Sequence, residues 1–421
     1  MKSIKHLKEI FKTPSEYFLV FIKWLTLGIL TGISGGVFGA FFVKSIQIVT
    51  DIRMAKNWLV YLLPLGGLVI VLIYRLCRVE NVGTNDIFKS VRSEKNIPKL
   101  LLPAIFIGSV ITHLFGGSAG REGAALQIGG SMASTYGKLL RLNEKNRHIY
   151  LMCGMSAVFS SVFGTPLTAT IFSIEVVSVG YLYSSALLPC LISSVSAYFV
   201  SIKLGITPER FSINSIPALE FKTVIFIFVV SIITALVGIL FCKSMHLSAH
   251  LFNKCFKNEY LRIMVGGIII ILLTLIVNSN DYNGGGIEII EKVFHNSEVK
   301  YEAFLLKIIF TSITIGAGYK GGEIVPTMFI GATLGGCIAS LFGLSIPFGA
   351  ALGISALFAA VTNCPIATLF LSLELFGQNG LLFFAISAFI SFLVSGYSSL
   401  YTEQKLIFSK FCDEVIDTNG K

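Results

Sequence analysis

The feature that most constrains this chain is a succession of apolar segments that fills nearly its whole length. A helix that crosses a bilayer needs roughly 20 mostly apolar residues, and only 13% of the residues here are charged, about half the share in an ordinary soluble domain. Glycine, proline or charged residues divide the apolar stretches at 18–43, 58–76, 99–116, 123–139, 149–163, 166–184, 185–204, 222–243, 261–278, 303–317, 324–343, 346–361, 365–376 and 379–400. The sequence therefore predicts an all-α polytopic membrane protein.

Several of these segments are too short to cross a bilayer alone, for example 149–163 and 365–376. Short apolar spans broken by glycine or proline are typical of transporters with discontinuous helices, whose freed backbone groups need protein or a water-filled cavity around them. The expected organisation is, in chain order, an N-terminal segment (1–17), a first transmembrane half (18–204), a connector (205–222), a second transmembrane half (223–402) and a short tail (403–421).

The formal net charge of +10 comes from basic residues that are spread over the ends and connectors of the chain. Lys2, Lys5, Lys8 and Lys12 precede the first apolar segment, and a positive flank favours the cytoplasmic side of a membrane. We therefore expect the N-terminus, and with it the C-terminus, in the cytoplasm. The basic residues form no run interleaved with aromatic side chains, so no nucleic-acid partner is expected. No metal-ligand set or cofactor loop stands out, so neither a metal nor a cofactor is expected.

An internal repeat relates the two halves. Residues 154–176 align without gaps on 353–375 at an offset of 199, and eight of the 23 positions are identical, which is more than shared apolar composition accounts for. Upstream, residues 120–122 (Gly-Arg-Glu) align on 321–323 (Gly-Gly-Glu) at an offset of 201. Such a duplication favours an inverted repeat with an ion site between the halves.

The first chemical motif is a glycine-rich stretch, Gly116–Gly130, that holds Arg121 and Glu122 at the start of an apolar segment. A charge in hydrocarbon costs roughly 2.5–3.5 kcal/mol or more, so such residues usually face a cavity or a partner. Glycines let a ligand approach the backbone, and the N–H groups at a helix start favour an anion. A carboxylate that leaves this place when protonated would couple an anion to a proton. The alternative is a buried salt bridge between Arg121 and Glu122.

The repeat partner of that stretch, Gly318–Ala332, again opens an apolar segment with glycines and carries Glu323 in its first turn. Two carboxylates at repeat-related helix starts are expected to point toward one central site. A protonated Glu323 would donate a hydrogen bond to a bound anion. The alternative is that Glu323 only complements the dipole of its own helix.

Two weaker motifs lie elsewhere. The stretch Asn81–Val91 contains a glycine break ahead of a polar helix start, where Asn85 and Asp86 are plausible caps. The last apolar segment ends with Tyr397 and Tyr401. A place in the aromatic belt at the membrane interface is the default interpretation of such tyrosines, although a phenolic O–H is also a good donor to an anion.

Together these motifs resemble the CLC family of anion channels and anion/proton antiporters, along essentially the whole chain. The Gly-Arg-Glu-Gly stretch at 120–123 is similar to the family signature that carries the external gating glutamate, so the resemblance implies Glu122 as the gate. The motifs around Gly83 and Glu323 stand where the family has two anion-binding loops, and Tyr401 stands where its anion-coordinating tyrosine lies. The implied fold is two inverted repeats of discontinuous, tilted helices, with no CBS domains in the tail.

Departures from the chloride-selective pattern are similar to the fluoride-specific branch of this family. Val82 stands in place of the serine that coordinates chloride, and Asn85 in place of the proline of the same loop. Glu323 occupies an ordinarily uncharged position, and Ile324 replaces a phenylalanine. Val176 stands where proton-coupled chloride members carry an internal proton-transfer glutamate, so that relay is expected to be absent.

The resemblance implies a homodimeric fluoride/proton antiporter of the cell (inner) membrane, which uses the inward proton gradient to expel cytoplasmic fluoride. Glu122 is the expected gating and proton-coupling residue. The residues expected to line or hold the anion are Val82, Gly83, Asn85, Gly123, Glu323, Ile324 and Tyr401. Those expected to be structural are Arg121, Glu175 and Glu374. The alternatives are a chloride/proton antiporter or passive anion channel of the same family and, from another class, a membrane-embedded enzyme with two catalytic carboxylates.

Overall fold

The computed structural model describes residues 14–80, 82–93, 96–213, 215–295 and 297–420. The four N-terminal lysines, and most of the predicted N-terminal segment, lie outside these residues. The helices of the first half are α2 (Pro14–Ala55), α3 (Leu63–Leu76), α4 (Thr84–Arg92), α5 (Leu101–Leu114), α6 (Glu122–Leu139), α7 (Glu144–Phe163), α8 (Pro166–Glu175) and α9 (Leu187–Lys203), with short 3-10 helices η1 (Asn57–Leu62) and η2 (Ser184–Ala186). Those of the second half are α10 (Phe221–Cys255), α11 (Glu259–Val277), α12 (Ile287–His295), α13 (Ala303–Ala317), α14 (Ile324–Phe342), α15 (Ile346–Thr362), α16 (Pro365–Phe376) and α17 (Leu381–Val394).

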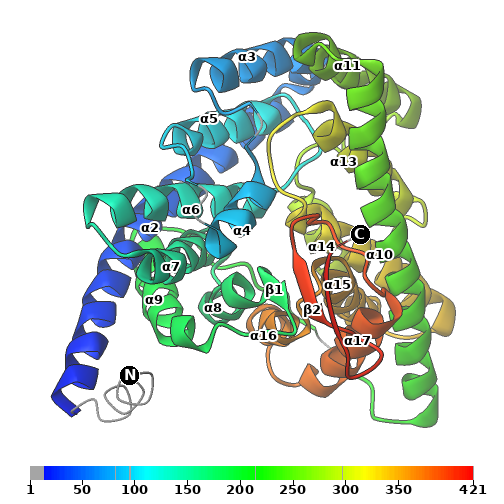
Figure 1. Ribbon diagram of the computed structural model, residues 1–421. Helices are drawn as coiled ribbons and strands as arrows, with labels where there is room; N and C mark the ends of the chain where they lie inside the picture. Colours follow the sequence, from blue (N-terminus) through cyan, green and yellow to red (C-terminus); the bar gives the residue numbers. More distant parts are fainter. Residues whose placement is uncertain (1–13, 81, 94–95, 214, 296, 421) are drawn as a thin grey trace.

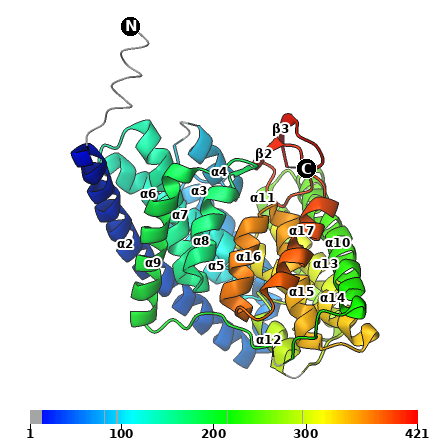
Figure 2. The ribbon, with the colours of Figure 1, turned by 90° about the horizontal axis from the view of Figure 1, so that it is seen from below.

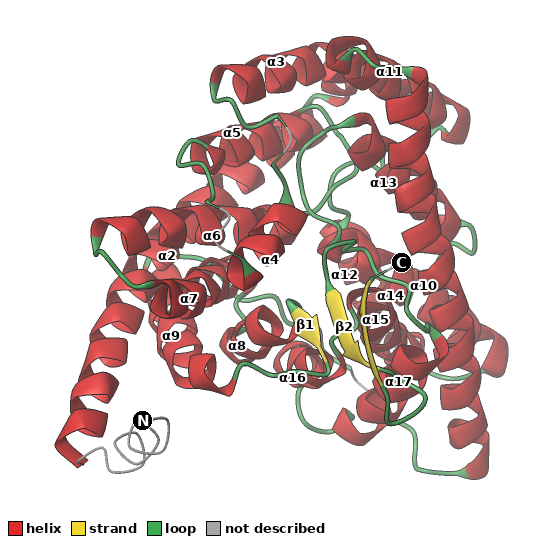
Figure 3. Cartoon of the chain, viewed as in Figure 1, coloured by secondary structure: helices red, strands yellow, loops and turns green. Residues whose placement is uncertain are grey.

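The two halves lie side by side as two helical bundles (Figures 1 and 3). In the first half α2 packs along α9 and α7, and in the second half α10 packs along α13 and α15. The halves meet where α11 packs on α3 and where α8 packs on α16. The sites that matter below lie along this boundary.

Six helical segments in the described part of the chain are long and apolar enough to cross a membrane, namely α2, η1 with α3, η2 with α9, α10, α11 and α14. Large apolar side chains of α10 are exposed and recur every three or four positions. They include Phe221, Ile225, Phe228, Ile232 and Leu236. A continuous apolar face of this kind suits lipid and not water. The prediction of a polytopic helical membrane protein is confirmed.

The inverted repeat is visible where the two glycine-rich motifs meet. The Gly120 N–H donates to the carbonyl of Gly322 at 2.6 Å, and the Gly322 N–H donates to the carbonyl of Gly120 at 2.7 Å, which makes an antiparallel bridge. The repeat offset of 201 relates Gly120 to Gly321, and Gly322 to Arg121. Gly321 and Arg121 are also the next pair of residues that face each other in this antiparallel register. A two-fold axis between the two segments generates this relation, so the halves are inverted with respect to each other.

Glycines draw together two repeat-related helix pairs, α6 with α7 and α14 with α15. A Cβ on Gly129 would overlap the backbone carbonyl of Gly154 in α7, and a Cβ on Gly331 would lie 2.5 Å from the carbonyl oxygen of Gly353 in α15. Larger side chains do not fit there, so the helices approach to backbone contact. This packing fixes the axes of α6 and α14, the helices that begin at the two predicted carboxylates.

The described residues also form one small sheet, an addition to the all-helical expectation. β1 (Ser178–Val179) pairs in parallel with β2 (Lys405–Phe408), and β2 pairs antiparallel with β3 (Val415–Asn419). Figures 2 and 3 show β2 and β3 in the C-terminal tail, whereas β1 follows α8 of the first half. The sheet therefore ties the tail to the first half. Strands this short carry too few residues for an alternating pattern to be visible in the sequence.

Several helices differ from the boundaries that apolar length suggests, and α10 and α12 show why. α10 continues to Cys255, well beyond the apolar segment 222–243, and α12 lies where no apolar segment is predicted. α12 is amphipathic, with Ile290 and Phe294 buried and Glu291 exposed. A half-polar helix lacks the apolar length of a membrane span, so a search for apolar segments misses it.

Candidate anion-binding site

The candidate site lies where the beginnings of α6 and α14 meet. Glu122 is the first residue of α6, and Glu323 directly precedes α14. The glycine bridge joins these two segments, and a Cβ on Gly123 would lie 3.1 Å from Oε2 of Glu323. The two predicted carboxylates are therefore brought together, at helix N-termini whose free N–H groups and dipoles favour an anion.

Glu122 is completely buried. Its Oε2 accepts a hydrogen bond from the backbone N–H of Arg121 at 3.1 Å, and its Oε1 lies 3.4 Å from Nε of Arg121. That second contact lacks hydrogen-bond geometry, and neither Oε1 nor Nε has a hydrogen-bond partner in the described part of the chain. The salt bridge that was the alternative interpretation thus exists only as a loose ion pair.

The backbone carbonyl of Glu323, and not its carboxylate, makes the hydrogen bonds at the start of α14. Its carbonyl accepts hydrogen bonds from the N–H of Thr327 at 2.9 Å and from the Thr327 hydroxyl at 2.8 Å. Its side chain makes no capping hydrogen bond to the first turn of α14, and its Oε2 has no hydrogen-bond partner among the described residues. The side chain is therefore not engaged as a helix cap.

Tyr401 reaches the same place from the C-terminal end of the chain. Its side chain is 2% exposed, and its ring packs edge-on against Phe88 of α4 with the centroids 5.0 Å apart. The hydroxyl has no hydrogen-bond partner within the described ranges, and the charges of Glu323 and Glu122 both act on it. A buried ring does not anchor a helix at the membrane interface, so the belt interpretation does not apply to Tyr401.

Three buried oxygen atoms around this point share one property. Oε1 of Glu122, Oε2 of Glu323 and Oη of Tyr401 have no hydrogen-bond partner among the residues that the structure describes. Buried polar groups in folded proteins nearly always have a partner, so such a cluster indicates a place where a ligand binds. A protonated carboxyl and a phenol both donate hydrogen bonds, whereas a charged carboxylate competes with an anion for the same place. The arrangement suits one anion together with one or two protons.

The loop before α4 contributes space to this region. A Cβ on Gly83 would meet nothing within 4 Å, and the Gly83 N–H donates to the Asp86 carboxylate at 3.1 Å, as expected of a cap. Val82 is partly buried against the core, and Ile324 at the start of α14 is fully buried. None of Val82, Gly83 and Ile324 carries a hydroxyl, so a chloride-type hydroxyl ligand is missing from these positions.

Asn85 bonds to the loop that carries Tyr401 and not to the three oxygens. Its Nδ2 donates to Oγ1 of Thr402 at 3.1 Å, and its Oδ1 accepts from the N–H of Glu403 at 3.3 Å. Arg92, in the same helix, donates to the carbonyl of Glu403. α4 therefore holds the tyrosine loop through Asn85, a contact that the sequence did not reveal.

Gln404 is a residue of this region that sequence reasoning missed. Its fully buried side chain donates from Nε2 to the carbonyls of Thr362 at 2.6 Å and Val176 at 3.1 Å, and its Oε1 accepts from the Ser399 hydroxyl at 2.8 Å. The Ser399 hydroxyl in turn accepts from the N–H of Tyr401 at 3.1 Å. Tyr401 is thereby fixed to the ends of α15 and α8. In the sequence, Gln404 is one polar residue in a polar tail, which does not separate it from a surface glutamine.

Glu175 and Glu374 cap each other's helices. Glu374 of α16 accepts at 2.9 Å from the N–H of Thr168 at the start of α8, and Glu175 at the end of α8 accepts at 2.7 Å from the N–H of Ala367 at the start of α16. The repeat offset of 199 relates these two bonds to each other. The pair joins the halves through reciprocal caps, and these carboxylates are satisfied by backbone N–H groups.

Glu374→Gln is predicted to destabilise the protein without changing ion coupling. A hydrogen bond to a charged group contributes about 1.5–3 kcal/mol, and the amide would present donors to the N–H groups that the carboxylate caps. The measurement is the midpoint of thermal unfolding in detergent. Glu291→Gln, at an exposed carboxylate of α12, is the matched control and should leave the midpoint in place. Equal midpoints for Glu374→Gln and the wild type would contradict the capping role.

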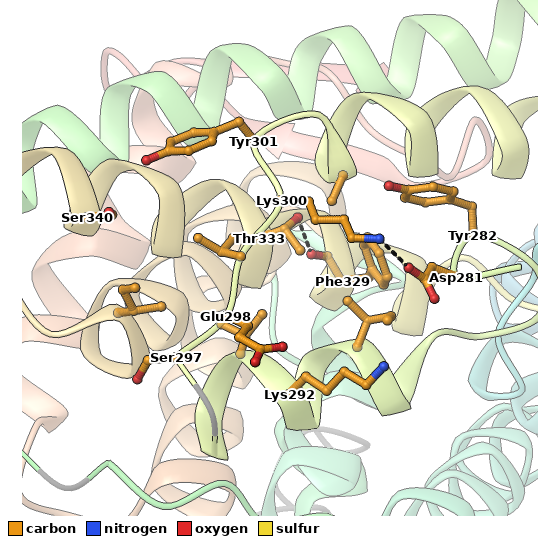
Figure 4. A pocket seen from close by; sticks show the side chains of 15 residues that line it. Asp281, Tyr282, Lys292, Ser297, Glu298, Lys300, Tyr301, Phe329, Thr333 and Ser340 are labelled. Atoms are coloured by element: carbon orange, nitrogen blue, oxygen red, sulfur yellow. Dashed lines mark hydrogen bonds and ion pairs between the residues drawn. The ribbon is translucent and has the colours of Figure 1, made fainter. Parts of the chain in front are cut away.

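A second cavity, of about 410 Å³, lies between α12, α13 and α14 (Figure 4). Lys300 Nζ donates a hydrogen bond to Asp281 Oδ2 at 2.8 Å in its wall, and this bond to the carboxylate raises the pKa of the Lys300 amine. Lys292 and Glu298 also line it. The lining includes none of the predicted site residues, so this cavity is separate from the candidate anion site.

Comparison with known proteins agrees with this geometry. The model of the family described as voltage gated chloride channel matches residues 66–396, a range that includes both helix starts. The chain belongs to this family. A CLC relative from Pseudomonas syringae pv. tomato, named chloride/fluoride channel protein, is 34% identical over 412 residues, which cover 95% of this chain and 90% of that one.

Solved structures of the family share the fold. The crystal structure of a CLC-type fluoride/proton antiporter has a TM-score of 0.89 and 32% identity and covers 94% of this chain and 100% of that one. The structure of a slow cyanobacterial Cl-/H+ antiporter has a TM-score of 0.76 at 20% identity and covers 88% of this chain and 94% of that one, and this likeness concerns the fold alone. The CLC-like fold of two inverted repeats is confirmed.

Proposed function

We propose that this chain is a fluoride/proton antiporter that exports cytoplasmic fluoride in exchange for protons. The proposal rests mainly on one observation. Glu122, Glu323 and Tyr401 come together, and each of them has one buried oxygen without a hydrogen-bond partner among the described residues. The relative named chloride/fluoride channel protein and the similar structure of a fluoride/proton antiporter support it.

The donor set suits fluoride better than chloride. Fluoride is small and strongly hydrated, so its dehydration is unfavourable unless strong hydrogen-bond donors replace water. Protonated carboxyls and phenols are such donors, and short bonds to an anion are strong. Chloride is softer and larger and is well served by hydroxyls, which Val82 and Ile324 do not provide. Two titratable groups beside the anion also join its movement to that of a proton.

Glu122 acts as the gate in this mechanism. When charged, its carboxylate occupies the anion path at the start of α6. An external proton that binds Oε1 removes the charge, weakens the attraction to Arg121 and to the helix N-terminus, and lets the side chain leave the path. Fluoride then passes outward, and Glu122 releases the proton inward when it returns. The proton gradient thus drives export of fluoride.

Glu323 and Tyr401 hold the fluoride while Glu122 is displaced. The Tyr401 hydroxyl is free to donate a hydrogen bond, and the Glu323 carboxyl can donate one once it is protonated. The backbones of Gly83 and Gly123 leave the room that the anion needs, since a side chain at Gly123 would touch the Glu323 carboxylate. Asn85 contributes by holding the loop of Tyr401.

The length of α2 supports an orientation. Its 42 residues span about 63 Å, more than the thickness of a bilayer, so its two ends lie on opposite sides. Figure 2 shows the start of α2 on the same face as the C-terminal strands, and α12 on the opposite face. We place both termini in the cytoplasm and α12 outside. The family further implies a homodimer in the cell (inner) membrane.

The test is fluoride efflux from proteoliposomes, recorded with a fluoride electrode while the external pH is followed. The proposal expects fluoride to leave against a proton that enters, in a fixed ratio, with chloride moving much more slowly. Chloride flux at a comparable rate would favour the alternative of a chloride transporter. Fluoride flux with no proton movement would favour a passive anion channel.

A further inference from the structure

A cavity of about 300 Å³ leads from the surface to the gate. Its rim includes the exposed residues Asp51, near the end of α2, and Glu291 of α12, whereas buried Gly120 and Arg121 lie at its bottom. The end of α2 and α12 lie on the face opposite to the C-terminal strands (Figure 2). In the proposed orientation this is the outer face, so the cavity brings the external solution to Gly120 and Arg121, which directly precede Glu122.

Glu209, from the connector between the two halves, lies in the wall of this cavity. Its Oε1 is 2.5 Å from Nη2 of Arg121, much closer than the 3.4 Å between Arg121 and Glu122. Side-chain exposure falls inward along these residues, from 19% for Glu209 to 9% for Arg121 and 0% for Glu122. An ion pair that is largely out of water is stronger than one on the surface. Glu209 therefore determines how the guanidinium of Arg121 is turned.

The pairing of Arg121 with Glu209 affects how Arg121 pairs with the gate, Glu122. Because Nη2 is committed to Glu209, the side chain of Arg121 offers Glu122 only Nε, without hydrogen-bond geometry, beside the bond from the Arg121 backbone N–H. Charge-assisted hydrogen bonds are roughly twice as strong as neutral ones, and bidentate pairs between arginine and carboxylate are the strongest of them. The charged gate is therefore less stabilised than a fully formed pair with Arg121 would make it.

We propose that Glu209 is a positioning residue of the gate. By holding Arg121, it keeps Glu122 loosely paired and sets the external pH at which the gate opens. The inference rests on the proposed function, because it assigns Glu209 a part in proton-coupled transport. Without the Glu209 carboxylate, Arg121 is free to turn toward Glu122, the charged gate gains a hydrogen-bonded partner, and a higher proton concentration is needed to open it.

Other charged and titratable groups also face the gate from the surrounding elements. They are Asp51 and Arg53 of α2, His113 of α5, Glu288 and Glu291 of α12, Lys307 of α13, Glu323 before α14, and Tyr401. Among the described residues, Glu209 and Glu122 are the two carboxylates within 4 Å of an Arg121 nitrogen. This contact separates Glu209 from the other acids of the cavity, and Glu291 is a matched control for the loss of a negative charge there.

The experiment measures fluoride efflux from proteoliposomes as a function of external pH for the wild type, Glu209→Gln and Glu291→Gln. For Glu209→Gln we expect the midpoint to move to lower pH by about one unit, a tenfold rise in the proton concentration required. For Glu291→Gln we expect a shift of less than about a third of a unit, since an exposed charge is screened by salt. Glu209→Asp keeps the charge with a shorter reach, so its shift should have the same direction and a smaller size.

The outcomes separate this inference from the proposed function. A wild type that moves fluoride without protons would overturn the proposed function itself. A coupled wild type would leave it standing, and equal midpoints for Glu209→Gln and Glu291→Gln would then overturn only the role of Glu209. A uniform loss of rate at an unchanged midpoint would do the same, because it indicates a merely structural contact. If Glu209→Gln does not fold, an unshifted Glu209→Asp midpoint overturns the inference.

Discussion

Glu122→Gln is expected to abolish proton movement while fluoride continues to flow down its own gradient. The amide has nearly the same shape as the protonated carboxyl but cannot release a proton or become an anion, so the gate can no longer compete with fluoride for its place. We expect the proton-to-fluoride ratio to fall by at least about tenfold, toward zero. The measurement is fluoride-driven proton uptake into liposomes, with fluoride efflux recorded in the same vesicles.

Glu175→Gln is the matched control for this experiment. It makes the same chemical change at another buried glutamate, one whose carboxylate caps α16 through the N–H of Ala367. This variant should be less stable but should retain the wild-type ratio of protons to fluoride. Proton uptake that persists in Glu122→Gln would show that the gate does not carry the proton, and loss of coupling in both variants would mean that the effect is not specific to Glu122.

Glu323→Ser is expected to weaken selectivity for fluoride over chloride by about 10- to 100-fold. A carboxyl close to the anion supplies a stronger hydrogen bond than a hydroxyl, and the loss of a bond to a charged group amounts to about 1.5–3 kcal/mol. Fluoride loses more than chloride because its dehydration is less favourable. The measurement is the ratio of initial fluoride and chloride efflux rates at equal gradients.

The control for Glu323→Ser is Glu374→Ser, which makes the same substitution in α16, where the carboxylate caps α8. It should keep the wild-type ratio of fluoride to chloride rates when the rates are normalised to folded protein. An unchanged ratio in Glu323→Ser would leave Glu323 with a structural role only, despite its unpartnered oxygen. A shift of equal size in both variants would indicate a general effect of lost stability.

The sequence alone predicted the class of the protein and the chemical centre of its site. Low charge and long apolar stretches follow from the bilayer as the solvent, so a membrane protein can be recognised from them without knowledge of its fold. The repeat could also be recognised from the sequence. So could the glycine-flanked carboxylates, Glu122 and Glu323, because charged residues within apolar segments are few and each could be considered individually. The placement of Tyr401 came from the resemblance to the family.

Only the tertiary structure decided which polar residues support that centre. Asn85 and Gln404 both fix the loop of Tyr401, and their partners lie far along the chain, at Thr402 for Asn85 and at Val176 for Gln404. Glu209 pairs with Arg121, which lies 88 positions earlier in the sequence. Local patterns encode which face of a helix is apolar, but contacts between distant segments depend on how the helices pack.

The partners of the four glutamates that stand in repeat-related positions also depend on the fold. The sequence favoured Glu122 and Glu323 as site residues and Glu175 and Glu374 as structural ones, but it did not show what their carboxylates contact. In the fold, Glu175 and Glu374 find backbone N–H groups of the opposite half, whereas Glu122 and Glu323 each keep an oxygen without a partner among the described residues. The sequence by itself determined that carboxylates stand at helix ends within the membrane. Tertiary structure decided which of them are satisfied by protein and which keep an oxygen without a partner among the described residues, because that depends on the neighbours that the inverted packing supplies.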